Sequence, residues 1–297
     1  MASPGDGRRV AVVTDSTASL PPALAASLGI VVVPLHVRID GVDHREGVDL
    51  TPQSLVASLR SGAVVSTSQP SPEAFALAYA QAAADGADEI VSVHLSGRLS
   101  GTVDAARLAA AGSAVPVHVV DSRTVGMALG LAVASAAHLA GRASAGDEPD
   151  AEVSGAACAL AAGRVAVRSS VHFAVDSLDH LRRGGRLGPV AAALGGVLGL
   201  RPVLVVAEGA LEVAEKVRTS ARARERIVEL ALADAAGRRS FDLAVHHLGQ
   251  PDLAQMLADR LDASAGPRLR TLHVVEVSAV VGAHVGPGVS AVVVADA

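Results

Sequence analysis

The sequence predicts an α/β protein made of two α/β domains, and three observations carry that prediction. Short Val-rich runs alternate with longer Ala- and Leu-rich runs through the first 140 or so residues, as strands and helices do in a mostly parallel sheet. Farther along, two apolar runs meet at the turn "AEGA", residues 207–210, which indicates a hairpin and a mixed sheet. A length of 297 residues suffices for two such domains.

The elements of the first half are bounded by residues that favour those boundaries. Gly29 and Gly62 end two helical runs, and the pairs Thr51–Pro52 and Ser71–Pro72 each supply an N-cap followed by proline at the first helical position. The predicted strands are 8–16, 30–39, 63–68, 88–95 and 115–122. The predicted helices are 20–29, 52–62, 72–86, 100–112 and 124–141.

A stretch rich in Gly, Pro and charge, residues 141–153, is the predicted linker. We therefore expect an N-terminal domain over 1–150, a C-terminal domain with a mixed sheet over 151–297, and a ligand in the cleft between them. The predicted strands of the second domain are 170–177, the two halves of 201–217, 241–249, 269–277 and 289–297. Its predicted helices are 151–163, 217–237 and 251–266.

Composition excludes several classes of function. A net charge of −5, no Trp, one Tyr and three Phe argue against nucleic acid as a partner, because such sites need cations and aromatic platforms. The single lysine, Lys216, lies in "EKVR", so the chain has no Walker A loop and is not a P-loop enzyme.

Cysteine usage and hydropathy predict a cytoplasmic protein without stable membrane insertion. Cys158 is the only cysteine, so the chain forms no intrachain disulfide, which fits a reducing compartment. The N-terminal residues lack the apolar core of a signal peptide. The longest apolar run, 187–200, has 14 residues, fewer than the ~20 that a membrane helix needs.

Hydroxyl-rich turns follow four of the predicted strands, at 14–19, 66–71, 94–102 and 120–124. Each turn alone is explained by helix capping. Together they predict a ligand site, because ligands of parallel sheets bind at the carboxyl ends of the strands. The 66–71 turn suits holding an anion without proton transfer. The 94–102 turn could cradle a phosphate or carboxylate, but it lacks the dinucleotide pattern G-x-G-x-x-G.

Histidines and arginines add further candidates. The stretch 280–288 places His284 in a predicted loop between strands, where it could bond an anion, shuttle a proton or have no role. Arginines flank a Gly–Gly break in 179–188, which is typical of an anion site or of a solvated helix end. The basic stretch 215–226 is expected to be mostly solvated helix face. The adjacent histidines 246–247 point to opposite faces of a strand, and we expect no metal site and no cofactor.

Several of these stretches, in this order and spacing, resemble the DegV family, whose characterised members bind fatty acids. The matching stretches are "VTDSTASLP", "STSQPSPEAF", "LSGT", "LDHLRRGGRLG", "LRPVL" with "EKVR", and "AHVGPG". The resemblance implies two α/β domains with one long-chain fatty acid buried between them. It also implies that Thr67, Ser100 and His284 hold the carboxylate of that fatty acid.

The chain is also similar to the acyl-carrying subunit of bacterial fatty acid kinase, which serves phospholipid metabolism. The similarity implies that a separate ATP-dependent kinase subunit phosphorylates the bound carboxylate to an acyl phosphate, and that this chain has no catalytic machinery of its own. Arg186 and Arg218 are then candidates for contact with phosphate or with the partner. Arg98 and Arg201 depart from the family pattern, and Arg98 could alter head-group electrostatics.

Two other functions stay open on the sequence. The chain could be an enzyme that acts on a small phosphorylated substrate, with the 94–102 turn and the arginines as its phosphate site. It could also be a stand-alone lipid sensor without a kinase partner.

Overall fold

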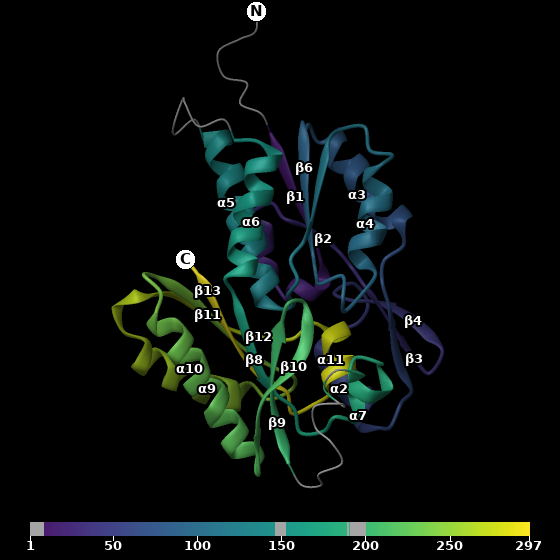
Figure 1. The fold of residues 1–297 in the computed structure, drawn as a ribbon. Coiled ribbons are helices and arrows are strands. Elements are labelled where there is room, and N and C mark those ends of the chain that lie inside the picture. The colour runs from purple at the N-terminus through teal and green to yellow at the C-terminus, as the bar shows by residue number, and fades with distance from the viewer. Residues whose placement is uncertain (1–8, 146–152, 189, 191–199) are drawn as a thin grey trace, which may run out of the picture.

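The computed structural model describes residues 9–145, 153–188, 190 and 200–297, and these form three sheets with flanking helices (Figure 1). The α/β class, the parallel sheet and the mixed sheet predicted from the sequence are confirmed. Most of the apolar run 187–200 and of the predicted linker lies outside the described residues. No helix in the described part of the chain is both long and apolar enough to cross a membrane.

The first sheet has four parallel strands and helices on both faces. Its order is β2 (Val31–Val33), β1 (Val10–Asp15), β6 (Glu89–His94) and β7 (Val117–Asp121). One face is covered by α5 (Met127–Ala145) and α6 (Gly155–Val167), the other by α3 (Pro72–Ala84) and α4 (Thr102–Ala110). Every residue of β6 is buried, as expected for a central strand covered on both faces.

The second sheet has six strands and is mixed. Its order is β10 (Ala210–Val217), β9 (Arg201–Ala207), β8 (Ser170–Ala174), β13 (Ser290–Asp296), β11 (Phe241–His247) and β12 (Leu269–Glu276), and only β11 and β12 run parallel. The predicted hairpin is β9–β10. Helices α9 (Ser220–Ala236) and α10 (Pro251–Ala265) cover its outer face, while its inner face packs toward α5.

A small antiparallel sheet, in the order β4 (Val42–Arg45), β3 (His36–Ile39) and β5 (Val65–Ser68), corrects the prediction of a single strand over 30–39. The run divides after Val33, because Pro34 has no N–H to continue a ladder. Its first part pairs with β1 and its second with β4 and β5. The second half, 35–39, alternates apolar with polar residues as a half-buried strand does, and that change of pattern was the available signal.

The prediction of a loop around His284 is wrong, because residues Ala279–Val285 form helix α11. Ser278 caps that helix by accepting a hydrogen bond from the N–H of Val281, and Gly286 ends it with φ +77°. These capping residues could have been recognised in the sequence. The three shorter helices among the described residues that complete the fold are α1 (Pro22–Ser27), α2 (Pro52–Arg60) and α7 (Asp179–Arg183).

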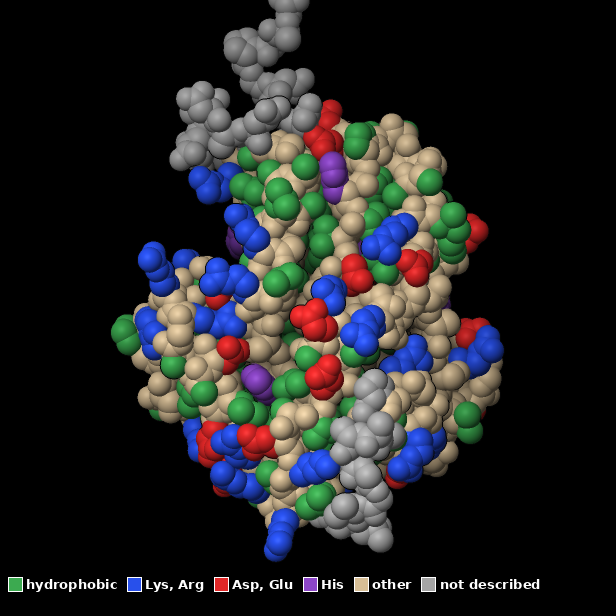
Figure 2. Space-filling view, viewed as in Figure 1, with side chains coloured by type: hydrophobic (Ala, Val, Ile, Leu, Met, Phe, Trp, Pro, Cys, Tyr) green, Lys and Arg blue, Asp and Glu red, His purple; other side chains and the backbone are tan. Residues whose placement is uncertain are grey.

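Charged side chains of both signs are intermixed on the face drawn in Figure 2. On α9, Arg222 donates to Glu225 at 2.9 Å and to Glu229 at 3.0 Å. Arg226 donates to Glu215 on β10, with Nε 2.7 Å from Oε2. The arginines at 222 and 226 in the basic stretch 215–226 are therefore engaged in ion pairs along the helix surface.

A domain boundary near residue 150 stays a prediction. Helix α6 follows that boundary in the chain, yet it packs on α5 and on the strands β6 and β7 of the first sheet. The start of α5 is in turn bonded to the second sheet, because Nε2 of His246 on β11 accepts the N–H of Met127 at 2.9 Å. The two large sheets are thereby joined through buried contacts.

Gly126, which precedes that bond, gives a test of the fold. Its φ is +67°, and a Cβ there would lie 2.9 Å from Nε2 of His246. We expect Gly126→Ala to lower the free energy of unfolding by about 1–3 kcal/mol, because alanine is strained at this φ and would disturb the bond to Met127. Denaturant unfolding measures the change. The control Gly163→Ala on α6, where a Cβ meets no atom within 4 Å, should instead stabilise by about 0.5–1 kcal/mol.

Candidate functional site

A cavity of about 330 Å³ lies where the second sheet faces the loops of the first. That volume is within the range of about 300–1000 Å³ typical of small-molecule sites. Most of its lining is aliphatic, from strands β8 and β13, helix α11 and the loop after β6. The polar residues that line it are Thr17, Thr67, Ser68, Gln69, Ser100, Arg186, His246 and His284. Among the described residues no Asp or Glu lines this cavity, and the composition of that lining suits an anionic or neutral ligand with a long apolar part.

Thr67 and His284, predicted from separate parts of the sequence, meet at this cavity. Oγ1 of Thr67 on β5 lies 2.8 Å from Nε2 of His284 on α11. Burial, and after it the nearby charge of Arg186, together lower the pKa of His284 to about 4. The imidazole is therefore neutral near pH 7 and can offer one N–H.

The position of the proton on His284 decides what Thr67 can do. Nδ1 of His284 is buried without a hydrogen-bond partner among the described residues, and it packs against Gly184, where a Cβ would collide with it. A buried N–H without an acceptor is the rarer arrangement, so we assign the proton to Nε2. His284 then donates to Thr67, and the Thr67 hydroxyl is free to donate into the cavity.

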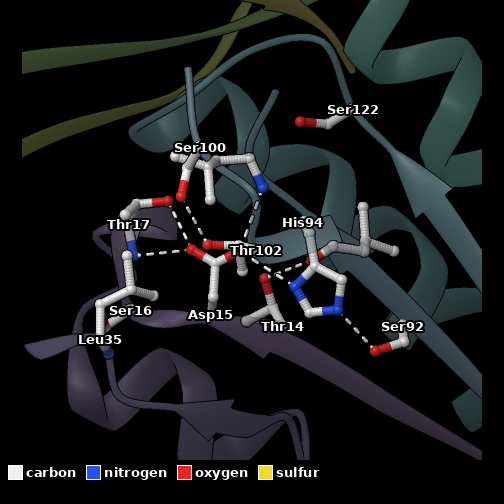
Figure 3. Close-up of polar contacts among 12 residues, drawn as sticks. Thr14, Asp15, Ser16, Thr17, Leu35, Ser92, His94, Ser100, Thr102 and Ser122 are labelled. Carbon is white, nitrogen blue, oxygen red and sulfur yellow. Dashed lines mark hydrogen bonds and ion pairs between the residues drawn. The ribbon is translucent and has the colours of Figure 1, made fainter. Parts of the chain in front are cut away.

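Ser100 and Arg186 lie at the same wall. The hydroxyls of Ser100 and Thr102 are 2.9 Å apart, just before and at the start of α4 (Figure 3). Arg186 donates from Nε and Nη2 to the carbonyl of Leu99, at 3.1 and 3.0 Å, and from Nη1 to the carbonyl of Gly184 at 2.6 Å. A fixed positive charge thus stands beside the residue that precedes Ser100.

Arg98 and Arg218 lie elsewhere. Nη1 of Arg98 donates to the carbonyl of Glu208 at 3.0 Å, and Arg98 does not line the apolar cavity. With Arg186 it lines a second, polar hollow of about 420 Å³, which shares Leu99 and Ser100 with that cavity. Arg218 is exposed just after β10 and lines neither space.

A buried polar network next to the cavity was not anticipated from the sequence (Figure 3). The carboxylate of Asp15, at the end of β1, accepts bonds from the N–H and hydroxyl of Thr17, at 3.0 and 2.5 Å. It also accepts the N–H of Leu95 at 3.0 Å, and it lies 3.0 Å from Nδ1 of His94. The polar residues inside the apolar run 88–95 were the available signal, since a buried strand tolerates polar groups only when they are paired.

The network extends from His94 to Ser92 and Tyr79 and has the order of a Ser-His-Asp triad. Oγ of Ser92 lies 2.7 Å from Nε2 of His94, and the Tyr79 hydroxyl donates to Ser92 at 2.8 Å. However, Ser92 and His94 have no exposed surface and line neither the apolar cavity nor the polar hollow. A nucleophile needs access to substrate, so we assign the network a structural role: it fixes Thr17 and Leu95 at the cavity wall.

Metal chemistry finds no support in this arrangement. Within the described ranges, no three His, Cys, Asp or Glu side chains are grouped so that they could hold a metal ion. Nε2 of His246, which lines the cavity, is used to cap α5, and burial lowers the pKa of His246 to about 4. The polar groups in the described lining are hydroxyls, the Gln69 amide, the imidazoles of His246 and His284, and the guanidinium of Arg186.

Comparison with known proteins gives consistent matches along the whole chain. The family described as "Uncharacterised protein, DegV family" matches residues 9–297. A DegV domain-containing protein of Streptomyces coelicolor is 47% identical over 287 residues, which are 97% of this chain and 98% of the relative. A solved DegV family protein from Thermus thermophilus, described by its fatty acid binding, has a TM-score of 0.85 at 36% identity and covers 97% of this chain and 100% of that one. The fatty acid binding protein DegV from Bacillus subtilis has a TM-score of 0.87 at 28% identity, with 98% and 100% covered.

Ser92→Ala separates a structural triad from a catalytic one. The variant leaves Tyr79 and Nε2 of His94 without their partner, so we expect the free energy of unfolding to fall by about 1–3 kcal/mol. Ligand retention should be unchanged, because Ser92 lies outside the cavity. Thermal unfolding and mass spectrometry of any ligand that co-purifies are the two measurements, with Tyr79→Phe as the matched control. An esterase activity that Ser92→Ala abolishes and Tyr79→Phe spares would contradict the structural role.

Proposed function

Since the chain belongs to the DegV family, we propose that it binds a long-chain fatty acid in the apolar cavity, with the carboxylate at the wall formed by Thr67, Ser100 and His284. The observation that carries the proposal is the contact between Thr67 and His284. It joins two segments 217 residues apart into one set of donors at the end of an aliphatic cavity.

The head-group wall suits an anion that leaves water. A buried carboxylate is costly unless it accepts hydrogen bonds, and bonds to a charged acceptor are about twice as strong as neutral ones. The Thr67 hydroxyl, supported by neutral His284, and the Ser100 hydroxyl supply such donors. The positive charge of Arg186 attracts the fatty acid carboxylate. Among the described residues its guanidinium bonds only to backbone carbonyls, so no protein carboxylate neutralises that charge. In this proposal the wall holds the carboxylate by hydrogen bonds and by the charge of Arg186.

The tail supplies most of the affinity. Each buried methylene contributes ~0.8 kcal/mol, so about 14 methylenes give roughly 11 kcal/mol before the costs of association. Loss of translational freedom and ordering of the chain take back several kcal/mol or more. The aliphatic lining from β8, β13 and α11 therefore sets affinity, and the polar wall sets the position of the chain in the cavity.

We further propose that the chain presents this fatty acid to an ATP-dependent kinase subunit. A carboxylate oxygen would attack the terminal phosphorus of ATP, giving an acyl phosphate as ADP leaves. The polar hollow beside Ser100, lined by Arg98 and Arg186, supports this proposal, because arginine forks match phosphate geometry and the hollow adjoins the carboxylate wall. Arg218, exposed and apart from both spaces, is assigned to docking of the partner.

Retention of lipid tests the head-group assignment. Native mass spectrometry of protein purified without added lipid should show a one-to-one adduct that is released by denaturation as a fatty acid. The double variant Ser100→Ala with His284→Ala should weaken retention by at least about tenfold, because bonds to a charged group are lost while the tail contacts remain. The control pair Ser27→Ala with His138→Ala changes exposed residues and should behave as wild type. Equal retention in both double variants would refute the assignment.

Arg218→Ala separates docking from lipid binding. Because Arg218 lines neither cavity, fatty acid retention should be unchanged. The affinity for the kinase subunit should fall severalfold, and the loss should shrink at high salt, since rim charges act mainly on association. Surface plasmon resonance with the kinase subunit at two salt concentrations gives the comparison, with Arg260→Ala on α10 as the control. Unchanged affinity for the kinase subunit at both salt concentrations would remove Arg218 from the interface.

A further inference from the structure

The first turn of the helix that carries His284 is bonded to Glu46, which connects it to two further segments. Glu46, which follows β4, accepts the hydroxyl of Ser16 at Oε2, 2.6 Å away, and the N–H of Val280 at Oε1, 3.3 Å away. Oγ of Ser16 also accepts the N–H of Leu35 at 3.0 Å. One carboxylate therefore links the turn after β1, the small antiparallel sheet and α11.

Glu46 stands in an unusual environment for an acid. It is only 8% exposed, and among the described residues it bonds to hydroxyl and backbone donors and forms no ion pair with a cation. Burial raises the pKa of Glu46 to about 7, against the opposing effect of the donors Ser16, Val280, Ala279 and Ser278. A buried acid kept without a cation needs a reason other than stability, because an apolar residue would fill the space at less cost.

Several titratable groups on the surrounding elements have partners of their own. Asp15, before the turn, bonds to Thr17, Leu95 and His94. His284 bonds to Thr67 on β5. On the hairpin of Glu46 itself, His44 and Arg45 lie 3.8 and 3.9 Å from the carboxylate of Asp49.

We propose that Glu46 is a positioning residue for the head-group wall: by holding the first turn of α11, it sets where His284 meets Thr67. The proposal rests on the proposed function, in which His284 supports the fatty acid carboxylate. Helix α11 spans only Ala279–Val285, and four of its residues line the cavity, so a shift of its first turn is passed to the whole wall.

The ionised and neutral forms of Glu46 differ in how firmly they hold the helix. The carboxylate accepts two bonds that are strengthened by its charge, one on each oxygen. Protonation weakens both and adds a proton that needs an acceptor. Glu46 should therefore hold the first turn of α11 firmly above pH 7 and weakly below it. Its contribution to global stability has the opposite sign, because the folded state binds the proton more tightly than the unfolded state does. Glu46 thus favours folding toward low pH.

The experiment compares wild type, Glu46→Gln, Ser16→Ala and the exposed control Glu225→Gln between pH 5.5 and 8.5. Transfer of a 16-carbon fluorescent fatty acid from protein to albumin gives the dissociation rate. We expect the wild-type rate to rise about tenfold as the pH falls through about 7, since charge-assisted bonds are lost. Glu46→Gln should release the fatty acid rapidly at every pH. Adding Ser16→Ala to Glu46→Gln should change the dissociation rate little, because both substitutions remove the same contact.

Two further readouts distinguish positioning from a merely structural role. Thermal unfolding of Glu46→Gln above pH 7 should occur at an equal or higher temperature than in wild type, because a buried charge is removed. In ligand-free protein, the ring signals of His284 in NMR spectra, assigned with His284→Asn, should show an inflection near pH 7 that is absent in Glu46→Gln.

The outcomes are separable. A Glu46→Gln rate that follows the wild-type pH profile, or an inflection of His284 that persists in Glu46→Gln, overturns the proposal. Faster fatty acid release from Glu46→Gln together with an unfolding temperature below that of wild type also overturns the proposal, since general destabilisation then explains the faster release. Wild-type protein that takes up no fatty acid refutes the proposed function instead, and the His284 spectra of ligand-free protein still decide the role of Glu46.

Discussion

The arrangement of the cavity depends on one buried carboxylate, that of Asp15. It has no exposed surface, and it accepts three hydrogen bonds, from Thr17 and Leu95, beside its contact with His94. These contacts join the carboxyl ends of β1 and β6, where the turn with Thr17 and the loop toward Ser100 leave the sheet. An anion at this depth is tolerated only with such a set of donors, so the loops that form the cavity wall are fixed by the need to satisfy it.

The cavity itself contrasts with that network, because the described part of its wall offers hydrogen-bond donors and the cation Arg186, with no carboxylate among its residues. The guanidinium of Arg186 is held by the carbonyls of Leu99 and Gly184, so its charge is oriented before a ligand arrives. Burial keeps His284 neutral, which lets it support Thr67 without adding a second positive charge that would need compensation when the site is empty. A preorganised wall of this kind favours binding over chemistry.

Buried titratable groups give the protein opposing responses to pH. His246 and His284 have pKa values lowered from 6.5 to about 4, so the folded state holds fewer protons than the unfolded one in that range, and stability falls with acidification. Glu46, raised from 4.5 to about 7, contributes in the opposite direction over an overlapping range. Glu46 therefore offsets only part of the histidine contribution, so global stability still falls with acidification while local contacts at α11 change.

The sequence by itself determined the α/β class, the hairpin at Gly209 and most strands and helices, because these follow from local periodicity and from caps such as Ser71 and Gly29. Its motifs also indicated the family and named Thr67, Ser100 and His284. Only the tertiary structure decided that 30–39 divides between two sheets, since the partner strands β1 and β5 are remote in sequence. The meeting of Thr67 with His284 and the roles of Asp15 and Glu46 likewise arise from contacts across 30 to 234 residues, which no local pattern encodes.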